Sequence, residues 1–170
     1  MNEYLGDITK RSERLIKQHG TRDPFVIAKN LGIMILYADG LKHLKGMYRV
    51  IKRNRFIILN SGNTDAMNAI VCAHELGHDQ LHREFAKTSP LQEFMLYDMA
   101  SRREYEANIF AADLLLDDRD VLEMIEKGYD ALQIARETET DINLVALKVD
   151  CLIRNGHTLK KQEHNNKFLK

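Results

Sequence analysis

Five consecutive residues, His74-Glu75-Leu76-Gly77-His78, combine two imidazoles and a carboxylate at a spacing suited to metal chemistry. They lie within an apolar run over residues 69–81, which predicts a helix. Residues four apart share one face of an α-helix, so His74 and His78 can both point at one ion. A tetrahedral zinc needs this geometry from its first two protein ligands. Glu75 lies about 100° further round the helix, where it suits proton transfer from a metal-bound water rather than ligation.

The two histidines also have a simpler interpretation as buried core residues. A helical projection of residues 64–85 places His74 and His78 on one stripe with four apolar residues, namely Met67, Ile70, Leu81 and Phe85. Two neutral histidines side by side on such an inward face would need several hydrogen-bond partners. We favour the metal site because one ion satisfies both rings. Cys72 projects to the opposite side of the helix, where we expect a small buried apolar residue.

A catalytic zinc usually has three protein ligands and one open position, so a third ligand is needed. The segment 103–112 offers Glu104 and Glu106. Glu104 lies at the centre of an apolar stripe, whereas Glu106 lies about 200° away, among charged residues. A carboxylate on an apolar stripe is costly unless a charge meets it, so we predict Glu104 as the ligand and Glu106 on a solvated face. Asn108, one turn after Glu104, can hold the outer nitrogen of His74 or His78, or else is a polar residue at the cleft rim.

The charge balance and the apolar runs exclude several classes of function. The 170 residues include 25 basic and 25 acidic side chains, so no overall basic field favours nucleic-acid binding. No apolar run reaches transmembrane length, and the first residues do not resemble a signal peptide. We therefore expect a cytoplasmic protein without direct nucleic-acid or membrane binding. Two cysteines, Cys72 and Cys151, do not make a disulfide framework.

The order of predicted elements is helices, then strands, then helices. Helices are predicted at residues 7–19, 24–31, 64–85, 118–126, 130–137 and 143–154, and strands at 33–37, 47–51 and 56–59, the last two as a hairpin. One long or kinked helix is predicted over 90–116, with Ser89 as its N-cap. This order favours an α+β fold in which a small antiparallel or mixed sheet of about three strands packs on the His-Glu-x-x-His helix. We expect one domain at 1–156, with a catalytic core at 23–117, a helical subdomain at 118–156, and a polar, basic tail at 157–170.

Two motifs together resemble the ImmA/IrrE family of zinc metallopeptidases. The first is Ala73-His74-Glu75-Leu76-Gly77-His78 followed by Leu81-His82, and the second is Glu104-x-x-Ala107-Asn108-x-Phe110-Ala111-Ala112-x-Leu114-Leu115. The resemblance extends over residues 23–116. It implies a zincin-like, mostly helical domain with a gluzincin-type site: one Zn²⁺ per chain on His74, His78 and Glu104, with Glu75 as the catalytic residue. Asp117 departs from the family, which often has proline there, but it lies past the site.

The resemblance also implies a substrate and its context. It implies an endopeptidase that cleaves a helix-turn-helix transcriptional repressor of a prophage or integrative element after DNA damage, and it allows for an activator protein as a second partner. Peptide hydrolysis needs a donor to the oxyanion, and Tyr48 and His82 are candidates; a sheet role for Tyr48 and a helix-end role for His82 are the alternatives. We also expect an edge strand of the hairpin to pair with an extended substrate.

Two further functions compete with the peptidase. The metal can be purely structural, in a protein that regulates a repressor partner by binding it without cutting it. Glu75 argues against this alternative, because a structural site gains nothing from a carboxylate at that position. The helical pair at 130–154 can also be a DNA-binding helix-turn-helix, but its surface is too acidic to face phosphates, with Asp130, Glu137, Glu139, Asp141 and Asp150.

Overall fold

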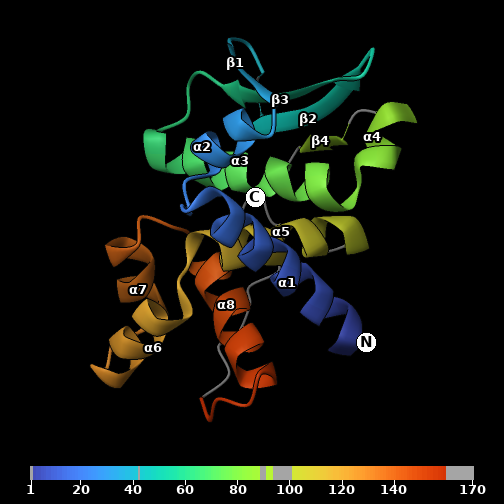
Figure 1. Ribbon diagram of the computed structural model, residues 1–170. Helices are drawn as coiled ribbons and strands as arrows, with labels where there is room; N and C mark the ends of the chain where they lie inside the picture. The colour runs from blue at the N-terminus through green and yellow to red at the C-terminus, as the bar shows by residue number, and fades with distance from the viewer. Residues whose placement is uncertain (1, 42, 89–90, 94–100, 160–170) are drawn as a thin grey trace.

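The computed structural model describes residues 2–41, 43–88, 91–93 and 101–159, shown as coloured ribbon in Figure 1. Within these residues the helices are α1 (Asn2–His19), α2 (Pro24–Asn30), α3 (Asp65–Leu81), α4 (Arg83–Thr88), α5 (Arg102–Leu115), α6 (Asp118–Glu126), α7 (Ala131–Glu137) and α8 (Ile142–Arg154). The strands are β1 (Met34–Ala38), β2 (Gly46–Ile51), β3 (Asn54–Asn60) and β4 (Leu91–Glu93). The predicted α+β class is confirmed. No helix in the described part of the chain is long and apolar enough to cross a membrane.

The strands form one mixed sheet in the order β1-β3-β2-β4. β1 runs parallel to β3, and β2 runs antiparallel to both β3 and β4. The predicted hairpin is confirmed, and its turn consists of Lys52 and Arg53, both at positive φ, as a tight two-residue hairpin turn requires. Both hairpin strands have a neighbour on each side, so the expectation that one of them offers a free edge to substrate is wrong.

The segment between α4 and α5 differs from the sequence prediction. A helix was expected over residues 90–116, but Leu91–Glu93 pair with β2 as a fourth strand and α5 begins only at Arg102. A strand of three residues is too short to show a recognisable alternation of apolar and polar residues. Its conformation is determined by pairing with β2 rather than by its local sequence. Ser89 and Pro90, expected to start that helix, lie outside the described residues, as do residues 160–170 of the expected tail.

The helices lie in layers on one face of the sheet. Figure 1 shows α3 directly beneath the strands, α5 beneath α3, and α8 on the far side of α5, with α1 crossing in front of α5. Alternate residues of the strands face α3, and Tyr48, Ile57 and Leu59 are fully buried there. Helix starts follow the sequence signals: Asp23 accepts N–H bonds at the start of α2, and Thr64 does so for α3.

A buried carboxylate fixes α3 against the sheet. Asp79, only 1% exposed, accepts hydrogen bonds from the Tyr48 hydroxyl at 2.6 Å and from the Arg55 and Arg83 guanidiniums at 3.1 and 2.8 Å. Arg55 also donates to the carbonyl of Leu31. These contacts join α3, β2, β3 and the end of α2, and they set which side of α3 faces away from the sheet.

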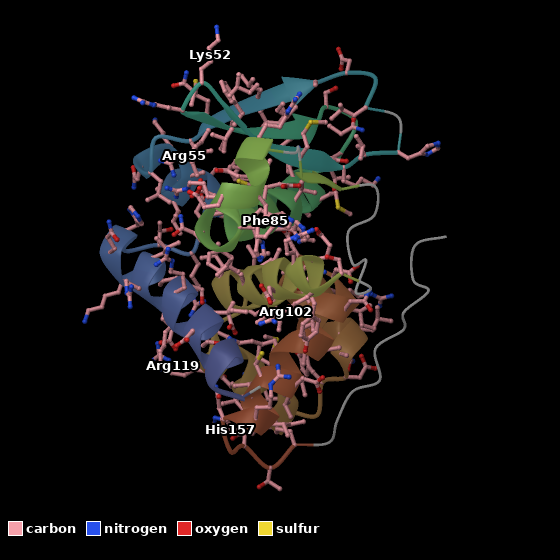
Figure 2. All side chains as sticks on the ribbon, turned by 90° about the vertical axis from the view of Figure 1, so that its right-hand side faces the viewer. Lys52, Arg55, Phe85, Arg102, Arg119 and His157 are labelled. Carbon is pink, nitrogen blue, oxygen red and sulfur yellow. The ribbon has the colours of Figure 1, made fainter. Side chains whose placement is uncertain are left out.

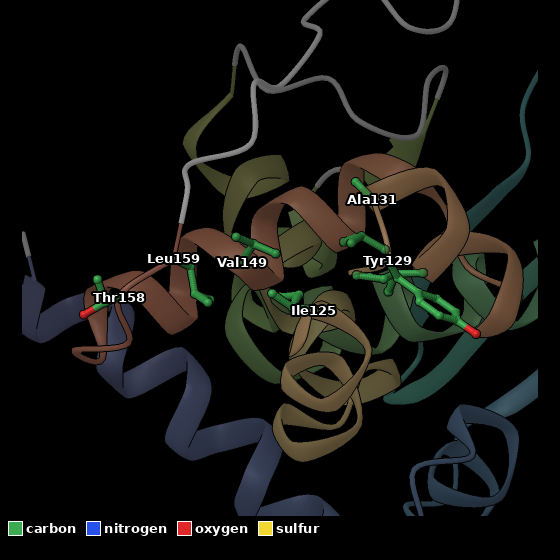
Figure 3. Close-up of a pocket in the computed structure, with 8 residues that line it drawn as sticks. Ile125, Tyr129, Ala131, Val149, Thr158 and Leu159 are labelled. Atoms are coloured by element: carbon green, nitrogen blue, oxygen red, sulfur yellow. The ribbon is translucent and has the colours of Figure 1, made fainter. Parts of the chain in front are cut away.

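A second buried ionic group joins the helices beneath. Asp113 on α5 accepts hydrogen bonds from the Lys148 ammonium at 2.9 Å and from the Thr9 hydroxyl at 2.6 Å, so α8 and α1 both attach to α5. Lys148 also contacts Asp118. Burial by itself would lower the pKa of Lys148, but the charges of the two aspartates outweigh it and raise that pKa. A mostly apolar cavity of about 270 Å³ lies nearby among α6, α7 and α8 (Figure 3).

Candidate metal centre

Three side-chain donor atoms meet between α3 and α5. The Nε2 atoms of His74 and His78 lie 3.1 Å apart, and Oε2 of Glu104 lies 3.2 and 3.3 Å from them. Ligand atoms about 2.0–2.1 Å from a tetrahedral zinc lie about 3.3–3.4 Å from one another. Two imidazoles and one carboxylate are also a donor set that zinc accepts. The three residues therefore fit a divalent metal of this kind without rearrangement.

Close packing of the two helices brings the third donor to the histidines. A Cβ added at Gly77 would lie 3.2 Å from the Cα and carbonyl oxygen of Ala107 and from Cδ1 of Phe110. A glycine on α3 facing an alanine on α5 thus lets the backbones approach closely. Glu104 precedes Ala107 by about one helical turn, so this crossing places its carboxylate beside His74 and His78.

The outer nitrogen of His74 is held by an amide on α5. Nδ1 of His74 lies 2.8 Å from Oδ1 of Asn108, and both side chains are fully buried. A carbonyl oxygen only accepts, so Nδ1 carries the proton and Nε2 keeps its lone pair toward the donor cluster. Asn108 therefore occupies the position that the sequence suggested for it.

The outer nitrogen of His78 has a different support. Its Nδ1 lies 3.0 Å from Nδ1 of His82, and Nε2 of His82 lies 2.9 Å from Oε2 of Glu106. Arg102 Nε donates to the other oxygen of Glu106 at 2.6 Å. Burial lowers the pKa of His82, and the hydrogen bond and charge of Glu106 only partly oppose this shift. His82 thus lies against a metal-ligand candidate and a carboxylate.

The predicted solvated position of Glu106 is wrong, because this residue is only 3% exposed. The projection assumed that α5 buries one face, whereas α3, α1 and α8 all pack against it. The spacing of His82 four residues after His78 was a signal for a histidine pair, but no periodicity in the sequence pointed to its acidic partner on α5.

The remaining sequence candidates divide into those near the donor cluster and those away from it. Glu75 is fully buried on α3, adjacent to His74 in the chain. Tyr48 lies with Asp79 instead, and burial raises the pKa of its hydroxyl. Cys72 is fully buried, and burial raises the pKa of its thiol, which disfavours a reactive thiolate.

A groove of about 670 Å³ runs beside the first half of α3. Met67 and Ile70 line it from α3, and Leu132 and Arg136 line it from α7. Ile70 precedes His74 by about one helical turn, so the groove borders the helix that carries both histidines. Its walls combine apolar side chains with charged ones.

Comparison with known proteins agrees with this geometry. Residues 28–149 match the family model Peptidase_M78, described as an IrrE N-terminal-like domain. Over 106 residues the chain is 39% identical to "Uncharacterized immunity region protein 2" of Bacillus phage phi105. That alignment covers 62% of this chain and 66% of the relative, so the chain spans just under two thirds of the relative's length. The family match includes α3 and α5 with all three donor residues. The chain therefore belongs to the Peptidase_M78 family of IrrE N-terminal-like domains and contains a metallopeptidase-like domain.

Proposed function

We propose that the chain is a zinc-dependent endopeptidase that cleaves a helix-turn-helix transcriptional repressor of a prophage or integrative element. The observation that carries the zinc site is the triangle of His74 Nε2, His78 Nε2 and Glu104 Oε2, with edges of 3.1–3.3 Å. Similarity to a phage immunity-region protein supports the choice of substrate. An activator protein would be a second partner.

Metal binding, proton transfer and ligand orientation are assigned to different residues. His74, His78 and Glu104 would hold the metal, and zinc bound there would lower the pKa of its water toward about 7 and polarise the scissile carbonyl. The Glu75 carboxylate accepts the proton of the attacking water and passes it to the leaving amine nitrogen. Burial of Glu75 keeps bulk water away from this transfer. Asn108 orients His74 through the 2.8 Å bond at its outer nitrogen.

Two measurements test the proposal. Elemental analysis should find about one zinc per chain, retained in Glu75→Gln and lost in Glu104→Ala. Glu123→Ala is the matched control, since that glutamate lies on the exposed side of α6. The second assay mixes zinc-loaded chain with the helix-turn-helix repressor encoded nearest to its gene, together with candidate activators, and follows fragments by mass spectrometry.

Cleavage should fall by roughly 10²–10⁴-fold in Glu75→Gln, as expected for loss of a general base. Cleavage by Glu75→Gln at the wild-type rate would rule out the proposed mechanism. Relief of repression by Glu75→Gln, with zinc bound and the repressor intact, would instead assign the chain to non-proteolytic binding. Zinc retained at full occupancy by Glu104→Ala would remove Glu104 from the ligand set.

A further inference from the structure

The two candidate histidine ligands are supported in unequal ways. The outer nitrogen of His74 meets the neutral amide of Asn108, whereas that of His78 meets His82, from which contacts continue through Glu106 to Arg102. His82 is 5% exposed and Glu106 is 3% exposed. Water therefore has little access to replace either group. The Arg102 side chain is 73% exposed, and Figure 2 shows it at the surface near the start of α5.

The direction of each hydrogen bond from His78 to Arg102 follows from Arg102, which can only donate. Arg102 donates to Glu106, which suits a carboxylate as acceptor. A carboxylate accepts, so Nε2 of His82 carries a proton and donates to it. A ring that carries its single proton on Nε2 has a lone pair on Nδ1, so Nδ1 of His82 is then an acceptor. His78 must therefore donate from its own Nδ1, across the 3.0 Å contact.

This ordering decides which nitrogen of His78 faces the donor cluster with a lone pair. A neutral imidazole with its proton on Nδ1 has a lone pair on Nε2, the atom that lies 3.3 Å from Glu104 and 3.1 Å from His74. With the opposite tautomer, Nε2 would carry the proton and could not bind a metal. Resting on the metal site proposed above, we propose that Glu106, acting through His82, is a positioning residue that fixes His78 in its metal-binding tautomer.

The wild-type protein alone can test the hydrogen-bond order. Long-range ¹H–¹⁵N correlation NMR of the metal-free chain, near pH 7.5, reports which ring nitrogen of each histidine is protonated. The expected result is protonation of His78 at Nδ1 and of His82 at Nε2. The reverse, His78 at Nε2 with His82 at Nδ1, would overturn the proposal. This spectrum is decisive even if a substitution at Glu106 prevents folding.

Zinc affinity then tests the role of Glu106. Competition with a chromophoric chelator should show Kd rising about 10–100-fold in Glu106→Ala, with loss of the single His78 tautomer. Glu106→Gln should recover most of the affinity, because its amide oxygen still accepts from His82 and the exposed Arg102 can turn away. Glu123→Ala, a glutamate paired with Lys127 away from the site, should bind zinc within twofold of wild type.

The same titrations separate this inference from the proposed function. A wild-type chain that binds no zinc would contradict the metal site, and with it both proposals. A wild-type chain that binds zinc, beside a Glu106→Ala variant with unchanged Kd and unchanged His78 tautomer, would contradict only the positioning role. Loss of affinity in both Glu106→Ala and Glu106→Gln, with the His78 tautomer intact in each, would also overturn it, since a purely structural effect would then explain the data.

Discussion

The neutral amide of Asn108 holds the outer nitrogen of His74 through a 2.8 Å hydrogen bond. Replacement by leucine keeps the size of the side chain but removes the acceptor, which leaves the buried Nδ1–H of His74 without that partner. We expect zinc Kd to rise about 10–100-fold in Asn108→Leu, measured by chelator competition. Asn143→Leu is the control, because Asn143 is also buried but bonds to Asp141 at the start of α8. An unchanged Kd in Asn108→Leu would show that the amide does not orient His74.

At the residue scale, the sequence was informative where spacing alone determines geometry. His74 and His78 are four apart on one helix, so their convergence follows from the helical period. The cost of a carboxylate on an apolar stripe predicts Glu104 as the third ligand, and the structure brings its Oε2 to both histidines. The same argument did not predict the buried position of Glu106. Its partner His82 lies at the end of α3, and a projection of α5 alone contains no information about α3.

At the element scale, the crossing of α3 and α5 determines whether three ligands can meet. Gly77→Ala should force the helices apart by a few tenths of an ångström, because the new Cβ would meet backbone atoms of Ala107 at 3.2 Å. A gain of about 1 kcal/mol in helix propensity opposes an overpacking cost of about 1–3 kcal/mol. We therefore expect a small loss in the free energy of unfolding but a clear rise in zinc Kd, since Glu104 lies one turn from the contact.

Gly6→Ala provides the matched control for this prediction. Gly6 also lies within a helix, α1, but nothing lies within 4 Å of the position of its Cβ. Its substitution should stabilise the protein by about 0.5–1 kcal/mol without any change in zinc Kd. Urea denaturation and chelator competition on both variants measure the two quantities. Unchanged zinc affinity in a folded Gly77→Ala variant would show that the site tolerates a wider crossing.

Elements with a strong pattern of their own were predictable, and those defined by a neighbour were not. The helices α6, α7 and α8 appear close to the expected bounds, since each begins at a capping aspartate: Asp117, Asp130 and Asp141. The hairpin of β2 and β3 follows from its β-branched and aromatic residues. In contrast, β4 exists through its pairing with β2, which no local pattern reveals.

At the scale of the whole molecule, Asp117 connects the end of α5, the start of α6 and the N-terminal region. Its carboxylate caps α6 and accepts from Arg22 at 2.7 Å. Burial alone would raise the pKa of Asp117, but the Arg119 N–H and the Arg22 side chain outweigh it and hold the pKa below its ordinary value. A carboxylate whose pKa is depressed on folding stabilises the fold above its unfolded pKa, and this contribution is lost as pH falls through the folded value.

Asp117→Asn keeps a capping oxygen but removes the charge. We expect metal-free wild type to exceed this variant in free energy of unfolding by roughly 1 kcal/mol near neutral pH. The difference should shrink toward zero as pH falls below the ordinary aspartate value of 3.8. Urea denaturation across this pH range measures it. Asp120→Asn, exposed on the same helix, controls for the loss of one negative charge, and a pH-independent difference for Asp117→Asn would contradict the assignment.

The division of the donor atoms between α3 and α5 has a thermodynamic consequence. His78 and Glu104 are far apart in an unfolded chain, so an ion that needs both has affinity for the folded state alone. By mass action, such an ion adds RT ln(1 + [L]/Kd) to the free energy of unfolding. The melting temperature would then depend on free zinc concentration, and so would the resistance of the folded chain to proteolysis.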